Sequence, residues 1–395
     1  MKTQNRGEVI MANHTAKKSF NAHNLSFLNQ PEMAERILKM QKALRKSLTA
    51  EEKKSDIPVI DLSLYETDPE AWSACFIFNL SKYGFAIFKN HGINEQEIES
   101  VYDAVKKLFA QPKEILDQYN VDATSQRGYS VFGRERHYKS NNTNPDMKEF
   151  FQFGPDNLTK KELEENQLPS NVWPKEVPEF KTRLQKLDQQ VQNIQDIVLT
   201  AIGIVLESDK ENYADDYFKY ADTIWRTIHY PALEGVEDTG GERSASHTDG
   251  GFATLLLSSN QKGLVVQPDK NDPSTWLRPE TGSKYIIMNV GRILDRMTKG
   301  YLPATWHMVE KPEDPTIARV SIPRFIWPND RFEIKEYDCP PPLLQNAGRQ
   351  TLTDELIKKH PVGQTIHEFR KGTLSLMKDA KKHTPTSSRK AHKPK

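Results

Sequence analysis

The sequence is poor in the features that mark secreted and membrane proteins. Its 395 residues contain two cysteines, Cys75 and Cys339, which cannot make a disulfide framework and are typical of a reducing compartment. No apolar run approaches the roughly 18 residues that a transmembrane helix needs, and residues 1–30 lack the apolar core of a signal peptide. We therefore expect a cytoplasmic protein that has no membrane partner.

The chain also lacks an excess of either charge. It has 55 Lys and Arg against 54 Asp and Glu, a net charge of +1, so no overall attraction to nucleic acid is expected. The one run in which basic and aromatic residues interleave, 126–138, has no basic face elsewhere to extend it. The expected partner is a small molecule in a pocket, bound by a monomer or weak dimer.

The first half of the sequence alternates predicted helices and strands. Apolar residues at helical spacing predict helices at 31–54, 69–82, 95–119 and 179–207, whereas 57–62, 85–89 and 146–154 have strand character and 158–178 is expected to be a loop. Pro112 is expected to start a new helical segment. The amphipathic helix at 31–54 either offers a surface to a partner or packs its apolar stripe on the rest of the chain.

Short strands dominate the second half. They are predicted at 223–230, 253–258, 263–267, 284–290, 305–309 and 318–327, separated by turn signals such as Gly250-Gly251. Many short strands at this spacing are typical of a double-stranded β-helix, the cupin-like jelly roll. The predicted fold class is therefore α+β, with the N-terminal helices and strands as a supporting layer for a jelly-roll core.

This pattern divides the chain into five predicted regions. An N-terminal extension with the amphipathic helix covers 1–55, and an α/β supporting region covers 56–210. The jelly-roll core covers 211–335, and a C-terminal segment that packs on it covers 336–377. The basic tail, 378–395, has almost no apolar residue and is expected to be disordered.

The chemistry is expected between Arg243 and Trp327. His247 and Asp249 are two residues apart, so in an extended strand their side chains share a face. His307 comes 58 residues after Asp249, following another strand-like run. These three residues, here called the triad, form a 2-His-1-carboxylate set that binds Fe(II) and leaves positions open for substrate and O2. Taken singly, His247 fits a turn before Gly250 equally well, and His307 fits a buried core histidine.

A second pair of residues favours the metal hypothesis. Arg319 and Ser321 lie in the predicted strand 318–327, where they share one face. A guanidinium fork beside a hydroxyl suits a carboxylate, which it holds bidentately and in a fixed orientation. The other Arg-x-Ser, Arg45 to Ser47, lies in a polar helical stretch without metal-like partners.

Several further motifs between residues 57 and 330 occur in an order that belongs to a known family. They are Ile57-Pro58-Val59-Ile60-Asp61-Leu62, Tyr83-Gly84-Phe85, Asn90-His91-Gly92-Ile93, Arg127-Gly128-Tyr129, Lys148-Glu149-Phe150, Arg226 through Tyr230-Pro231, Asn289-Val290-Gly291, Thr298-Lys299-Gly300 and His307-Met308-Val309. With the triad and Arg-x-Ser, the sequence resembles the isopenicillin-N-synthase-like family of iron(II)/2-oxoglutarate-dependent oxygenases.

The resemblance implies an enzyme and its cofactors. The triad would hold Fe(II), and Arg319 and Ser321 would bind the distal carboxylate of 2-oxoglutarate with a hydroxyl contact from Tyr230. Oxidative decarboxylation of 2-oxoglutarate by O2 would then be coupled to hydroxylation, desaturation or cyclisation of a small organic substrate, in a barrel braced by helices. The chain departs from the family at Ile228, where Asn is common, and at Arg292, where Asp is common.

The substrate side follows from strand alternation beyond Ser321. Phe325 and Trp327 fall on the same face and are expected at the mouth of the barrel. By resemblance, the facing wall would come from Phe132, Arg134, Phe151 and Phe153. We expect a substrate with a carboxylate or other anionic group paired to Arg134; the alternative is that Phe325 and Trp327 are core residues and Arg134 is solvated.

Three other functions stay open at this point. A relative could oxidise its substrate with O2 without 2-oxoglutarate, as the penicillin-forming and ethylene-forming members do. The same fold could serve a non-enzymatic, metal-dependent binding protein, because fold does not determine function. A Zn(II) hydrolase is the third, although no general-base glutamate stands at motif spacing.

Overall fold

The computed structural model describes residues 31–120, 126–135, 144–207, 212–235, 241–258, 261–269, 272, 274–340 and 347–371. Residues 1–30 of the predicted extension and the whole predicted tail, 378–395, lie outside these ranges. Both cysteines are free thiols. Within the described ranges, no helix has both the length and the apolar character needed to cross a membrane.

Helices and strands mix along the chain, and short 3-10 turns at Glu52–Lys54, Leu62–Thr67 and Asp117–Tyr119 join some of them. The helices are α1 (Pro31–Ser47), α2 (Pro69–Tyr83), α3 (Glu95–Phe109), α4 (Lys113–Leu116), α5 (Lys160–Glu165), α6 (Pro178–Leu206), α7 (Tyr213–Phe218), α8 (Arg292–Met297) and α9 (Ala347–Lys359). The strands are β1 (Val59–Asp61), β2 (Phe85–Lys89), β3 (Gly128–Ser130), β4 (Glu149–Phe153), β5 (Ile224–Tyr230), β6 (Ser244–His247), β7 (Ala253–Leu257), β8 (Leu264–Gln267), β9 (Ile286–Val290), β10 (Trp306–Val309) and β11 (Arg319–Ile326).

The strands form two sheets. The large sheet has eight strands in the order β1-β2-β9-β7-β11-β5-β4-β3, and the small sheet has three in the order β6-β10-β8. Apart from the parallel pair β1 and β2, neighbouring strands are antiparallel. Strands from both sides of residue 210 therefore share one sheet, so the predicted supporting region and the predicted core are built together.

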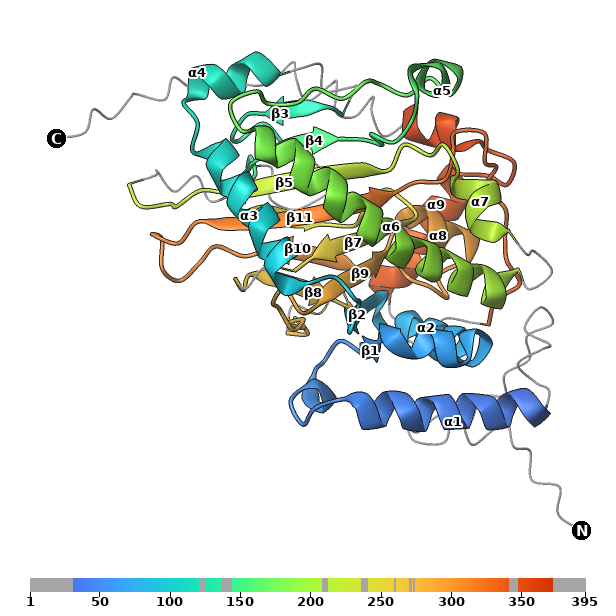
Figure 1. Ribbon diagram of the computed structural model, residues 1–395. Helices are drawn as coiled ribbons and strands as arrows, with labels where there is room; N and C mark the ends of the chain where they lie inside the picture. The colour runs from blue at the N-terminus through green and yellow to red at the C-terminus, as the bar shows by residue number, and fades with distance from the viewer. Residues whose placement is uncertain are drawn as a thin grey trace, which may run out of the picture.

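Helices cover the outer face of the large sheet. Figure 1 shows α3 and α6 crossing in front of the strands, with α2 beside them and α1 beyond α2. Phe180, Leu184 and Val191 of α6 are buried in the main hydrophobic core. The apolar stripe of α1 packs on α2 rather than being left open to a partner, as one of the two sequence interpretations predicted.

The inner face of the large sheet meets the small sheet. Val309 of β10 packs against Phe150, Ile228 and Tyr230 of the large sheet. A second inner cluster joins Leu264 and Val266 of β8 to the inward residues of the strands at the other edge, Val59, Phe85, Ile87 and Ile287. The space between the two sheets is thus lined by side chains from both, and the triad lies at one end of the small sheet.

Two predicted elements differ from the structure at the local level. The helix predicted over 31–54 ends at Ser47, because Thr49 and Glu52 exchange hydrogen bonds and start a separate short turn. The predicted loop 158–178 contains α5, which begins with a capping box between Thr159 and Glu162. A Thr followed three residues later by Glu was the signal for this helix in the sequence.

Candidate active site

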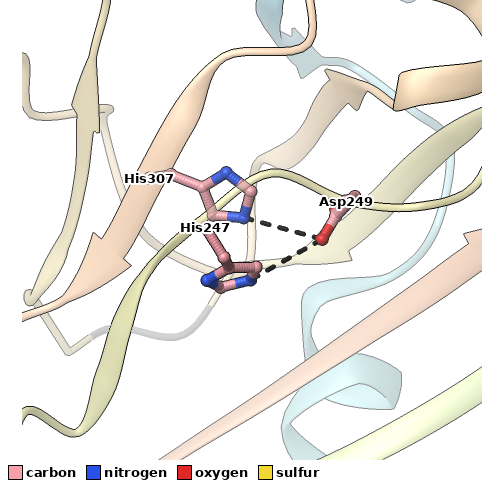
Figure 2. Close-up of side chains that lie close together, drawn as sticks. All are labelled: His247, Asp249 and His307. Carbon is pink, nitrogen blue, oxygen red and sulfur yellow. Dashed lines mark ion pairs between the residues drawn. The ribbon is translucent and has the colours of Figure 1, made fainter. Parts of the chain in front are cut away.

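The triad comes together at one end of the small sheet. His247 ends β6, His307 lies in the adjacent β10, and the two are direct partners in the antiparallel pairing. Figure 2 shows both imidazoles close to the carboxylate of Asp249, with 3.7 Å between each Nε2 and Oδ1. The potential ligand atoms all lie within 4.8 Å of one another, so a single ion can contact all three.

Backbone hydrogen bonds orient both imidazoles. His247 Nδ1 lies 2.8 Å from the oxygen of Ala245, and His307 Nδ1 lies 3.0 Å from the oxygen of Thr305. Because a carbonyl oxygen only accepts, each Nδ1 carries a proton, and Nε2 is the ring nitrogen that faces Asp249 and can bind a metal ion once it is unprotonated. A neutral imidazole with a free Nε2 is the form that binds a metal ion.

Asp249 is held by two donors that were not predicted as site residues, although Asn289 belongs to one of the family motifs. Thr254 Oγ1 and Asn289 Nδ2 donate to its Oδ2 at 2.5 and 2.8 Å, which leaves Oδ1 facing the histidines. Burial raises the pKa of Asp249, but the two histidines and these hydrogen bonds outweigh burial and lower the pKa to about 2. The carboxylate is therefore ionised at neutral pH, as a metal ligand must be. Thr254 and Asn289 are register partners on β7 and β9, a pairing that no local pattern reveals.

Arg319, Ser321 and Tyr230 form a second group, here called the carboxylate subsite. Arg319 and Tyr230 are direct partners across β11 and β5, and the guanidinium carbon lies 5.2 Å from the centre of the tyrosine ring. All three side chains are buried. Nε and Nη1 of Arg319 have no hydrogen-bond partner among the described residues. A buried guanidinium with free N–H groups is suited to bind an anion.

Arg243 lies beside this subsite and was not predicted as a site residue. It immediately precedes β6 and donates through Nη2 to the backbone oxygen of Ile317. The pairing of β6 with β10 has an irregularity between His307 and Val309, where Val309 pairs with Ser244. Because of this irregularity, the in-out alternation of side chains along β6 cannot be extended from His247 to Arg243. The direction of the Arg243 side chain is therefore known only from the tertiary structure.

Two of the predicted substrate residues lie near the triad. Phe325 of β11 is the register partner of Thr254, which contacts Asp249. The ring of Trp327 lies so close to the backbone after Asp249 that a Cβ on Gly251 would be 3.4 Å from it. Both positions agree with the predicted alternation along the strand from Arg319.

Phe151 and Phe153 lie on the opposite face of the large sheet. The ring of Phe151 packs 5.4 Å from that of Phe180, and the ring of Phe153 packs 4.9 Å from that of Trp173. This corrects the expectation that they form the facing wall of the substrate site. Their neighbour Phe150 instead belongs to the inner cluster with Tyr230, because successive residues of a strand point to opposite faces.

Arg134 and Phe132 are both partly exposed. Arg134 donates to the side chain of Asn120 at 3.0 Å in exposed surroundings, so no contact of its guanidinium places it beside the triad. Arg292 is a different case. In the part of the chain that the structure describes, its Nε is buried without a hydrogen-bond partner, and its Nη2 would be 3.0 Å from a Cβ on Gly250, the residue after Asp249.

Two parts of the chain match described protein families. Residues 57–176 match the family described as "non-haem dioxygenase in morphine synthesis N-terminal", and residues 222–328 match the 2OG-Fe(II) oxygenase superfamily. Together the matches span more than half of the sequence. The chain belongs to the iron(II)/2-oxoglutarate-dependent oxygenases. This confirms the prediction from the sequence motifs, and the enzyme is a dioxygenase that uses Fe(II), 2-oxoglutarate and O2.

Named relatives of this oxygenase are distant. It is 28% identical over 267 residues to the 2-oxoglutarate-dependent dioxygenase ecdK of Aspergillus rugulosus, covering 62% of this chain and 77% of that protein. It is 23% identical over 352 residues to a 1-aminocyclopropane-1-carboxylate oxidase of Dictyostelium discoideum, covering 79% and 90%.

Solved structures share the fold of this oxygenase. A 2OG-Fe(II) oxygenase family protein from Caulobacter crescentus aligns with a TM-score of 0.63 at 26% identity, covering 77% of this chain and 99% of that one. A full-length Neurospora crassa protein, solved in complex with alpha-KG, aligns with a TM-score of 0.60 at 23% identity, covering 79% and 98%.

Proposed function

We propose that the triad holds the Fe(II) of this oxygenase and that the carboxylate subsite binds the distal carboxylate of 2-oxoglutarate. The observation that carries this proposal is the placement of an ionised Asp249 and two oriented imidazoles between the same two sheets as the unpaired guanidinium of Arg319. When bound, the iron supplies the O2 activation that couples decarboxylation of 2-oxoglutarate to oxidation of the substrate.

In this proposal the protein contributes orientation and exclusion of water. The carbonyl oxygens of Ala245 and Thr305 hold the imidazoles with Nε2 free, while Thr254 and Asn289 keep the carboxylate aimed and ionised. Arg319 fixes the far end of the cosubstrate, which converts a freely rotating dicarboxylate into one with a single orientation.

The facing sheets support a double-stranded β-helix as the core of the molecule. The regions 56–210, 211–335 and 336–377 then describe parts of one structure, because the large sheet includes strands from the first two. The cytoplasmic location and the monomeric or weakly dimeric state stay predictions from the sequence.

The substrate is proposed to be a small organic molecule with an anionic group. Phe325 and Trp327 would supply the apolar side of its site. Arg292 replaces Arg134 as the cation that we favour, because its Nη2 lies next to Gly250, its Nε has no hydrogen-bond partner among the described residues, and its charge acts on Asp249. Hydroxylation, desaturation and cyclisation are equally compatible with this arrangement.

The test is succinate release from 2-oxoglutarate by the purified protein, with and without Fe(II), across a panel of small carboxylic acids. We expect release that requires Fe(II) and that Asp249→Ala abolishes, while Asp314→Ala, which alters an exposed loop carboxylate, leaves it intact. Circular dichroism should show both variants folded. Full activity of Asp249→Ala would place the metal elsewhere, and substrate oxidation without any need for 2-oxoglutarate would favour the direct use of O2.

A further inference from the structure

Arg243 and Arg319 are buried arginines that share one part of the interior. Only 2% and 3% of their surfaces are exposed. Arg243 donates to the backbone oxygen of Ile317, which is two residues before Arg319 in the chain. Burial lowers the pKa of Arg243 and repulsion from Arg319 lowers it further, to about 10. The backbone geometry places them side by side: Ser244, the residue after Arg243, pairs with Val309, and a Cβ on Gly263 would lie 3.5 Å from Val309 Cγ1 and 3.9 Å from Arg319 Cδ.

No carboxylate among the described residues neutralises either guanidinium. Nε of Arg243 and both Nε and Nη1 of Arg319 are buried without a hydrogen-bond partner, and neither side chain is paired with a carboxylate in the described part of the chain. Lys148, a buried cation nearby, shows the usual arrangement, because Asp146 and Glu135 each lie 2.7 Å from its Nζ. A buried charge without a partner is costly, and two neighbouring charges of the same sign are more so.

Arg243 and Arg319 are connected to the triad through β10, on the side where the distal end of a cosubstrate bound at the triad would lie. Val309 shares β10 and its inward side with His307, and it pairs with Ser244, the residue after Arg243. Tyr230, whose ring contacts Arg319, packs on the same Val309. Val309 thus connects the strand of His307 with Tyr230 beside Arg319 and with the backbone next to Arg243.

We infer that Arg243 is a second guanidinium for the distal carboxylate of 2-oxoglutarate, which then lies between Arg243 and Arg319. This inference rests on the function proposed above. A carboxylate offers about four lone-pair positions, enough for N–H groups from both arginines. Arg243 would thus select a 2-oxo dicarboxylate over a 2-oxo acid that lacks the second carboxylate.

The experiment measures binding rather than turnover. Isothermal titration of the protein loaded with Mn(II) compares 2-oxoglutarate with 2-oxobutyrate, which keeps the 2-oxo acid head but has no distal carboxylate. Arg243→Met should weaken 2-oxoglutarate about ten- to a hundredfold, the loss expected for one charge-assisted hydrogen bond, and leave 2-oxobutyrate unchanged. Arg243→Lys should recover part of the loss, because it keeps the charge but not the fork.

Arg296→Met is the matched control. Arg296 is also buried and also donates to a backbone oxygen, that of His360, but it pairs with Glu336. Its loss should lower the melting temperature and leave 2-oxoglutarate affinity unchanged. Arg243→Met should lower the melting temperature of the ligand-free protein less than Arg296→Met does, because Arg243 loses its hydrogen bond to Ile317 but no carboxylate partner, and a buried charge is removed.

The outcomes separate this inference from the proposed function. If the wild-type protein does not bind 2-oxoglutarate, the proposed function fails and the inference fails with it. If the wild type binds but Arg243→Met binds equally well, only the inference is overturned. An equal loss for 2-oxoglutarate and 2-oxobutyrate would also overturn it, because Arg243 would then act only through the fold.

Discussion

Replacing Thr254 by valine tests whether Asp249 is a metal ligand whose orientation depends on its neighbours. Valine has nearly the same shape as threonine but cannot donate the 2.5 Å hydrogen bond to Oδ2 of Asp249. A hydrogen bond to a charged group contributes about 1.5 to 3 kcal/mol, and residues that support metal ligands typically account for about 10- to 100-fold in affinity. Because Asn289 still donates to the same oxygen, we expect a loss in that range rather than complete loss.

The assay is titration of the metal-free protein with Mn(II) or, without oxygen, with Fe(II). Thr227→Val is the control, because the buried Thr227 hydroxyl donates to the backbone oxygen of Phe151, away from the triad. It should leave metal affinity unchanged. One opposing effect exists, since a carboxylate with fewer hydrogen bonds is more basic and binds a cation more strongly. Unchanged or tighter metal binding by folded Thr254→Val would show that the hydrogen bond does not position Asp249 for a metal.

Two further predictions concern stability. Phe151→Ala should destabilise the protein by about 3 to 5 kcal/mol in denaturant melts and leave the KM for 2-oxoglutarate unchanged, because its ring packs on Phe180; a raised KM at normal stability would contradict this. Glu52 is buried, which raises its pKa, but hydrogen bonds from Lys89, Thr49 and Tyr285 outweigh burial and lower it to about 2. In the unfolded chain its pKa is about 4.3, so Glu52→Gln should lower the melting temperature at neutral pH. The difference in melting temperature between wild type and variant should shrink as the pH falls from about 4 toward 2. A difference as large at pH 2 as at pH 7 would refute this.

Much of the fold and of the triad was predictable because local periodicity carries that information. Residues two apart in a strand share a face, which pairs Arg319 with Ser321 in β11. The same rule pointed to His247 and Asp249, although β6 ends at His247 and Asp249 follows it outside the strand. The amphipathic stripe of α1 and the new helical segment after Pro112 follow from the same kind of local rule.

The same rule did not determine which face of a strand is the inner one. Phe151 and Phe150 alternate as expected, but the choice between them depends on whether α6 or the small sheet covers each face. The departure at Arg292 was visible in the sequence, whereas its position beside Gly250 was not. Packing between distant elements decides such questions, and no window of local sequence contains it.

The sequence by itself determined which residues could carry iron chemistry, because residue type and spacing of two set the ligands and their shared face. Only the tertiary structure decided which further residues surround and orient these side chains. Three features depend on strand pairings between distant segments: the register that makes His307 the partner of His247, the pairing of Thr254 with Asn289 behind Asp249, and the pairing of Ser244 with Val309. The pairing register of a strand is set by the burial of its apolar face, and the site residues that lie opposite one another are a consequence of that register.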